Sequence, residues 1–173
     1  SSSTLSFVDG SSDVVLDSTY AEYMFYIVNI HPSTTASFTF NMSTDSGSNY
    51  NVTKTTTYFR AYHDEAGGGG VLAYDAPVDL AQSTAFQDLT ADTVTDDSDS
   101  GVSGFIHLYS PSSTTFVKHF IAKINSIKDA TNNEGKNSFS AGYGNTTSAV
   151  DAIQFKFDSG NMDSGDIFLH GLT

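Results

Sequence analysis

The segment ASFTFNMS, residues 36–43, decides the fold class. Apolar and polar residues alternate along it, which is the period of a β-strand with one buried and one solvated face. Upstream, YMFYIVNI (residues 23–30) is apolar at nearly every position, as expected for a central strand of a sandwich. The pair His31-Pro32 ends this strand, because proline cannot donate a hydrogen bond to a sheet. The two segments together predict a β-rich domain.

Further strand patterns recur along the chain, separated by turn-forming Ser, Gly, Asn and Asp residues. The other ranges with strand character are 56–65, 102–109, 116–125, 139–143, 149–157 and 166–172. About ten antiparallel strands at this spacing predict an all-β, jelly-roll-like β-sandwich. Residues 79–89 have a weak helical spacing, so at most one short helix is expected.

Length, charge and cysteine content limit the functions that the chain can have. Its 173 residues fit one domain, with the SSST of residues 1–4 as a linker and 5–173 as a single β-sandwich domain. Seven Lys and Arg against 20 Asp and Glu give a net charge of −13, which argues against nucleic acid as a partner. No apolar run approaches the roughly 20 residues of a membrane span, so no membrane insertion is expected. The absence of cysteine excludes disulfides and thiolate chemistry, and no cofactor is expected.

Two loops stand out by composition. Residues 66–70 include four successive glycines, which predict a mobile loop and not a phosphate cradle, because no GK[ST] motif follows. Residues 90–101 (TADTVTDDSDSG) have no hydrophobic period and predict an exposed acidic loop. Asp96, Asp97 and Asp99 within it are weak calcium candidates, since the glycine and the bidentate glutamate of a calcium-binding loop are missing.

No motif predicts catalysis. A G-x-S-x-G nucleophile elbow is absent, and Glu65 and Glu134 are expected in loops and not as a carboxylate pair across a cleft. A pair built from aspartates stays open as the alternative. Asn-x-Ser/Thr sequons begin at Asn41, Asn51 and Asn145, and carry little weight in a chain so rich in these residues. The histidines have no metal-ligand spacing and are expected to be structural or exposed; they are His31, His63, His107, His119 and His170.

Tyrosines at expected strand ends and loops indicate a binding surface. The side chain offers a flat apolar face and a polar tip, which suit both sugars and protein interfaces. Tyr62, His63, Asp64 and Tyr74 flank the glycine loop and are the expected receptor-contact residues, with ordinary edge residues as the alternative. The wider set of surface candidates is Tyr20, Tyr50, Tyr58, Tyr62, Tyr74 and Tyr143.

Five longer motifs, in this order, resemble virion proteins of marine bacteriophages that are tail-fibre-like or structural. The closing pattern SGNxDSGxIxLxG, residues 159–171, is the most specific. The motifs are STYAEYMFYIVNIHPST (18–34), FTFNMSTDSGSNYNVTKTTTYFRAYH (38–63), LAQSTAFQ (80–87), SPSSTTFVKHF (110–120) and AGYGNTTSAVDAIQFKFDSGNMDSGDIFLHGL (141–172).

The resemblance implies a non-enzymatic virion protein, made in the host cytoplasm and displayed on a tail fibre or on the capsid exterior. Its expected partners are other virion proteins, further copies of itself as a homo-oligomer (a homotrimer favoured), and a host-surface carbohydrate or receptor. Two alternatives stay open. One is a capsid decoration or head-spike protein that contacts other virion subunits, and the other, less favoured, is a polysaccharide depolymerase.

Overall fold

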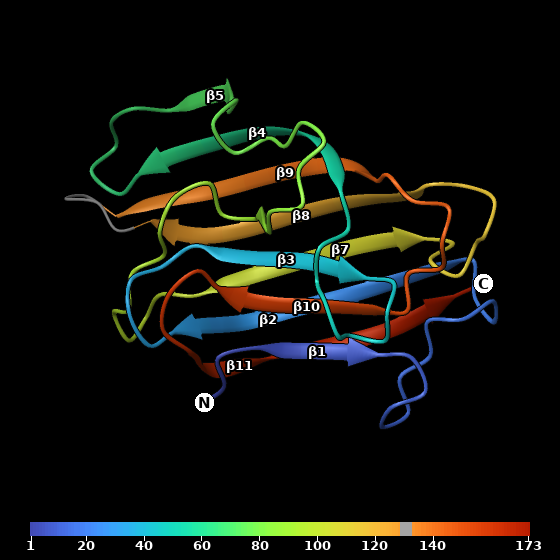
Figure 1. The fold of residues 1–173 in the computed structure, drawn as a ribbon. Helices are drawn as coiled ribbons and strands as arrows, with labels where there is room; N and C mark the ends of the chain where they lie inside the picture. Colours follow the sequence, from blue (N-terminus) through green and yellow to red (C-terminus); the bar gives the residue numbers. More distant parts are fainter. Residues whose placement is uncertain (129–132) are drawn as a thin grey trace.

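The computed structural model describes residues 1–128 and 133–173, and none of these residues is helical. Two antiparallel sheets face each other, which confirms the predicted all-β sandwich (Figure 1). The smaller sheet has the order β1-β10-β3-β6, and the larger has the order β11-β2-β7-β8-β9-β4-β5. The strands are β1 (Leu5–Val8), β2 (Glu22–Pro32), β3 (Phe38–Ser43), β4 (Lys54–Asp64), β5 (Val71–Tyr74), β6 (Gln87–Asp88), β7 (Val102–Tyr109), β8 (Lys118–Lys128), β9 (Glu134–Gly144), β10 (Ala152–Phe157) and β11 (Met162–Leu172).

The strand count and order differ in part from the expectation. Sheets of four and seven strands exceed the eight strands of a simple jelly roll, so that topology is not confirmed. Within residues 1–4, where a linker was expected, Ser2 exchanges two backbone hydrogen bonds of 2.8 Å with Met162 on β11. Glu134, expected in a loop, is the first residue of β9.

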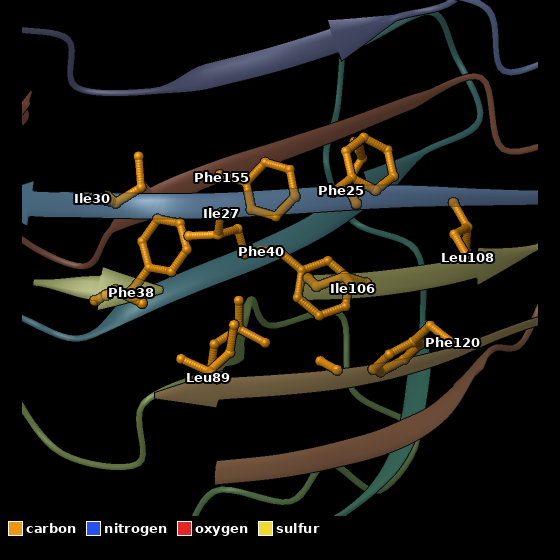
Figure 2. Packing of buried hydrophobic residues seen from close by; sticks show 14 of the residues in the cluster. Phe25, Ile27, Ile30, Phe38, Phe40, Leu89, Ile106, Leu108, Phe120 and Phe155 are labelled. Atoms are coloured by element: carbon orange, nitrogen blue, oxygen red, sulfur yellow. The ribbon is translucent and has the colours of Figure 1, made fainter. Parts of the chain in front are cut away.

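Phenylalanine rings from both sheets fill the core (Figure 2). The ring of Phe155 on β10 lies 5.6 Å from that of Phe25 on β2 and 6.0 Å from that of Phe38 on β3. Phe40 packs edge-on against Phe120 of β8, with ring centroids 5.0 Å apart. Burying one such side chain contributes about 2 kcal/mol, so these contacts bind the two sheets into one unit.

The polar side of β3 is also buried, which corrects the predicted solvated face. Asn41 is fully buried, and its Nδ2 donates to the main-chain oxygens of Tyr50 (2.7 Å) and Thr84 (2.9 Å). These two residues belong to the loops that precede β4 and β6, and both loops fold over the strand. Alternation shows which side chains share a face, but it carries no information on distant loops that cover that face.

Lys54, the first residue of β4, is fully buried next to Asn41. Its Nζ donates to Asn41 Oδ1 (2.5 Å) and to the main-chain oxygen of Val52 (2.9 Å). Burial disfavours the ammonium and lowers the pKa of Lys54 to about 7. Lys54 therefore loses its proton at a lower pH than an exposed lysine does.

Residues 79–89, where a short helix was possible, run along the edge of the sandwich instead. Ser83 exchanges two backbone hydrogen bonds with Lys54 (2.8 and 3.0 Å), and Leu80 accepts the amide of Thr56 (2.8 Å). Further on, β6 pairs with β3. Two neighbouring strands thus satisfy the backbone of this segment, and this pairing overrides a weak helical period.

The acidic loop of residues 90–101 is partly buried, which corrects the expectation of a fully exposed loop. Val94 is fully buried and exchanges two backbone hydrogen bonds with Ala36 (2.8 and 3.1 Å). Thr90 and Thr95 in the same loop are also buried. A stretch without hydrophobic period can still be held at a sheet edge by a single apolar side chain and its backbone.

Charged side chains fasten this loop to the larger sheet. The Asp92 carboxylate lies 2.5 Å from Nζ of Lys136, a residue of β9 that is 1% exposed, and it also pairs with Arg60 of β4. Burial opposes the charge of Asp92, but the neighbouring Lys136, Arg60 and Lys128 outweigh it and lower the pKa of Asp92. Asp92 is therefore the counterion that lets a lysine occupy the interior.

Candidate functional site: a polar pocket at the end of the larger sheet

A polar pocket of about 370 Å³ opens where β11, β2, β7 and β8 lie next to one another. Part of its wall comes from the loop of residues 98–101, which precedes β7. The side chains that matter for its chemistry come from five segments of the chain: Asn29, His31, Asp99, Ser103, Asn125 and Ser164.

A β-bulge in β2 places Asn29 at the pocket. The pairing of β2 with β7 shifts between Ile27 and Ile30, and Asn29 adopts a left-handed backbone conformation (φ 49°). Asparagine tolerates this conformation better than most residues. The Asn29 amide N–H donates to Ser103 Oγ (3.0 Å), whose hydroxyl donates back to Asn29 Oδ1 (3.1 Å). The bulge thus orients an amide and a hydroxyl on neighbouring strands as one unit.

The facing strand β11 is irregular at the same level. Its pairing with β2 shifts on both sides of Ser164, and Gly165 has a φ of +95°. A Cβ atom at position 165 would lie 2.3 Å from the main-chain oxygen of Asn29, so a side chain cannot be placed there. Glycine at this position permits the close approach of β11 to the bulge.

His31 is held at both ring nitrogens. Its Nε2 lies 3.0 Å from the main-chain oxygen of Asp97, and its Nδ1 lies 2.8 Å from Asp163 Oδ1. A carbonyl oxygen only accepts, so Nε2 carries a proton, and the contact with the carboxylate favours a second proton on Nδ1. Burial disfavours the imidazolium, but the hydrogen bonds to Asp97 and Asp163 outweigh it and raise the pKa of His31. The imidazolium joins the acidic loop to β11.

Several polar groups of the pocket have no partner within the described chain. The side chains of Ser98, Asp99, Ser100 and Ser164 make no hydrogen bond to any described residue, although they line the pocket. The hydroxyls can donate and accept, and the carboxylate can accept. These groups can bind a polyhydroxylated ligand without first breaking bonds inside the protein.

The three calcium candidates have different surroundings. Asp96 Oδ1 accepts the hydroxyl of Thr35 (2.8 Å), Asp97 holds His31 through its main-chain oxygen, and Asp99 lines the pocket. In the described ranges, no group of three or more His, Asp or Glu residues is arranged to hold a metal ion.

The expected receptor-contact residues lie at the opposite edge of the larger sheet, on β4 and β5 (Figure 1). Successive residues of β4 point to opposite faces, so Tyr62 and Asp64 share one face and His63 the other. Tyr74, opposite Phe59 on β4, lies on the side of His63. None of the four lines the polar pocket. The structure therefore does not gather the four residues on one surface.

Tyr58, another of the expected surface tyrosines, lies in the interior. Tyr58 is fully buried, and its hydroxyl donates to the main-chain oxygen of Leu89 (2.9 Å). The expectation that Tyr58 lies at the surface is therefore wrong. The pocket residues Asn29, Ser103 and Asn125 were not identified from the sequence. Three features of the sequence did point near the pocket: His31 as the end of a strand, Asp99 as a calcium candidate, and the motif of residues 159–171.

Comparisons of this chain with protein-family models, with curated proteins and with solved structures find no match. In the part of the chain that the structure describes, no helix is long and apolar enough to cross a membrane.

Proposed function

We propose that this chain is a non-enzymatic domain of a bacteriophage virion, of tail-fibre type, and that its polar pocket binds a host-surface carbohydrate. The observation that carries the proposal is the pocket itself, where hydroxyl and carboxylate groups converge without partners in the described chain. Sugar hydroxyls both donate and accept, so they complement such groups. A volume of about 370 Å³ lies at the small end of the range for ligand sites and fits one or two sugar units.

The charges around the pocket favour a neutral or amino sugar over an acidic one. Asp99 lines the pocket, and the Asp163 carboxylate already engages Nδ1 of His31. The whole chain carries a net charge of −13. The described residues that line the pocket include no lysine or arginine, so an anionic sugar would meet this field without such a cation to pair with, whereas an ammonium group would be attracted.

The strand order supports a virion-type sandwich when the extra strands are set aside. Without β7, β8 and β11, the sheets become β1-β10-β3-β6 and β2-β9-β4-β5, two antiparallel sheets of four strands. The chain passes from one sheet to the other at each of these connections except the β4–β5 hairpin. We propose that the domain is a jelly roll, the eight-stranded architecture of viral capsid and lectin domains, enlarged by a β7–β8 hairpin and an edge strand. The inserted strands also supply Ser103 and Asn125 to the pocket.

Binding without hydrolysis is the proposed activity. The register of β4 and β9 sets Asp64 opposite Glu134, which is the type of carboxylate pair that a depolymerase uses. However, Asp64 Oδ1 accepts the amide of Gly68 (2.7 Å), and Glu134 lies 3.5 Å from Nζ of Lys128. Both carboxylates therefore have structural partners. A reducing-end assay on host polysaccharide should give no release of sugar above background.

A second candidate function is capsid decoration or a head spike, with contacts to other virion subunits. It is favoured by the apolar outer side of the larger sheet, where Tyr26, Phe59 and Phe168 are 41%, 43% and 50% exposed. Such a protein would assemble stoichiometrically on particles and would have no affinity for sugars.

Glycan binding by pocket variants tests the proposal. Asp99→Asn and Ser164→Ala remove pocket groups that have no hydrogen bond to the described chain, so both variants should fold normally. Their matched controls are Glu65→Gln and Ser148→Ala, at exposed positions outside the pocket. A glycan array first identifies a neutral or amino sugar ligand.

We expect Asp99→Asn to weaken glycan binding about tenfold, as for a lost hydrogen bond to a charged group, while both controls bind as wild type. If Asp99→Asn and Ser164→Ala bind the same glycan as tightly as the wild-type chain does, the polar pocket is not the binding site.

A further inference from the structure

A continuous row of large side chains crosses all seven strands of the larger sheet. Each member is the direct cross-strand partner of the next, so their side chains point to the same side of the sheet. This side is turned away from the smaller sheet, and it is called the outer face below. The row, called the aromatic ladder, consists of Phe168, Tyr26, Phe105, Lys123, Phe139, Phe59 and Tyr74.

The ladder leaves large apolar surfaces in water. Phe168 is 50% exposed and Tyr74 is 58% exposed, and they lie at opposite edges of the sheet. In the neighbouring row, Ile121 at the middle of the sheet is 45% exposed. Exposed apolar side chains that stand singly need no explanation, but a contiguous stretch across a whole sheet marks an interaction surface.

The outer face is nearly neutral in a strongly acidic protein. The ladder and the next two rows on one side of it, through His107 and through Tyr109, contain one lysine, Lys123, and one acid, Glu22. The row on the other side, through Ser103, adds one acid, Asp166. Glu22 is paired with His107 on the same face. The chain as a whole carries a net charge of −13. Two copies would repel each other in most orientations, and a face with so few charges lowers that repulsion.

The orientation of the rings favours a protein partner over a sugar. Phe59 and Phe139 stack on each other, with centroids 4.8 Å apart and planes 7° apart. Tyr26 and His170 meet edge to face. Stacked rings present their edges outward, whereas a sugar ring binds to an aromatic face. A protein surface with its own apolar side chains can fill the spaces between such edges.

The dimensions of the outer face suit a stable interface. Seven strands spaced about 4.8 Å apart, with three rows about 6.8 Å apart, give roughly 700 Å² of flat area. Side-chain relief adds to this value. A standard protein interface buries about 800 Å² on each partner.

We infer that the outer face of the larger sheet binds a second copy of this chain, with the aromatic ladder at the centre of the contact. Copies that dock through this face bury exposed apolar side chains and bring few charges together. The inference goes beyond glycan binding, because it assigns a surface to self-association. The polar pocket borders this surface, since Ser103 and Asn125 lie two residues beyond Phe105 and Lys123.

Lys123 restricts the symmetry of the contact. It occupies the fourth of the seven ladder positions, and its Nζ lies 5.4 Å from the centre of the Phe139 ring. A two-fold axis through the middle of the ladder would bring two Lys123 ammonium groups together. The copies are therefore related by an axis displaced from Lys123, as in an offset dimer or in a closed ring.

Sedimentation equilibrium of charge-insertion variants tests this inference. Ile121→Glu and Tyr26→Lys each place a charge at an exposed position of the outer face. The matched control, Phe116→Glu, inserts a charge at a 70% exposed position in the β7–β8 loop. We expect the wild-type chain and Phe116→Glu to form oligomers at tens of micromolar. We expect Ile121→Glu and Tyr26→Lys to have the monomer mass of 18.5 kDa.

A wild-type chain that is monomeric at 100 micromolar overturns the inference, as does an Ile121→Glu or Tyr26→Lys variant that retains the oligomer mass. Thermal melts followed by circular dichroism verify that each variant is folded. If one charge variant does not fold, the other still decides the outcome.

Thiol labelling gives a second readout that requires no disruption. The chain has no cysteine, so Ile121→Cys and Phe116→Cys each carry one reactive thiol. Maleimide should label Ile121→Cys more slowly at 100 micromolar than at 1 micromolar, and Phe116→Cys equally fast at both. Equal rates for Ile121→Cys overturn the inference. Glycan binding by the same samples reports on the pocket separately, so failure of one proposal leaves the other tested on its own.

Discussion

The buried Lys54 should make the stability of this domain rise with pH above neutrality. In the unfolded chain a lysine keeps its proton up to a pKa near 10.5, whereas burial lowers the pKa of Lys54 in the folded chain to about 7. Between these values the unfolded state binds more protons than the folded state. The free energy of unfolding therefore increases as the pH rises from 7 towards 10.

The magnitude follows from the two pKa values. From pH 7 to pH 9, linkage at one such group adds about 2 kcal/mol to the free energy of unfolding. Lys118 and Lys136 act in the same direction, because burial also lowers the pKa of each. Ordinary domains have a total stability of about 5–15 kcal/mol, so the contribution of Lys54 alone is measurable.

Urea unfolding of wild type and Lys54→Met at pH 7 and pH 9 isolates the contribution of Lys54 to the pH dependence of stability. The wild-type chain should gain about 2 kcal/mol more than Lys54→Met between the two pH values, whatever the absolute stability of the variant. The control Lys156→Met removes a half-exposed lysine on β10, away from the outer face, and leaves Lys54 in place, so it should keep the wild-type difference. Parallel pH dependence of wild type and Lys54→Met would refute the reasoning.

Three further perturbations test other parts of the account. Asp92→Asn removes the counterion of the buried Lys136 and should lower the free energy of unfolding in urea by about 3 kcal/mol. Unchanged stability would show that the ion pairs of Asp92 do not hold the loop of residues 90–101 to the sheet. The pKa of His31 is raised above its unfolded value near 6.5, so protonated His31 stabilises the fold at low pH, and this stability is lost as the pH rises through the folded pKa. His31→Gln should therefore lower the free energy of unfolding more at pH 5.5 than at pH 9. An equal loss at both pH values would contradict an imidazolium in the pocket. In Gly165→Ala the new methyl group meets the main-chain oxygen of Asn29, so this variant should lose about 2 kcal/mol or more of stability and bind glycan more weakly. The control Gly10→Ala has a φ of +75° but open space around it, and should lose about 1 kcal/mol. Similar losses in thermal melts would show that the close approach at Gly165 is unimportant.

Local pattern predicted the strands well where one side faces the core. The range 102–109 agrees with β7 at both ends, because Val102, Ile106 and Leu108 are fully buried between half-exposed neighbours. Proline at position 32 is the last residue of β2, as expected from its missing amide hydrogen. These features depend on a few adjacent residues, which the sequence displays directly.

Features that depend on pairing between segments far apart in the sequence could not be predicted. Asn41 alternates like a solvated residue, yet the loops that contain Tyr50 and Thr84 cover it. The bulge at Asn29 is a feature of the pairing between β2 and β7, which periodicity within β2 does not reveal. The register between strands likewise decides that Phe59 and Phe139 stack, although each strand alone shows only an outward aromatic residue.

The candidate site also depends on distant pairing and not on adjacent residues. Tyr62, His63, Asp64 and Tyr74 are close in sequence, and adjacent residues of a strand point to opposite faces, so proximity along the chain did not make a common surface. The polar pocket draws on five separated segments and has no local motif. Its location became apparent only from the order of the strands.

Immunogold electron microscopy of intact particles, with antibody raised against this chain, tests the central claim most directly. The account predicts label on the particle at the tail fibres, where a host-surface carbohydrate would be met. Label spread over the head would contradict the attachment role and favour decoration, and particles without label would contradict a virion protein altogether.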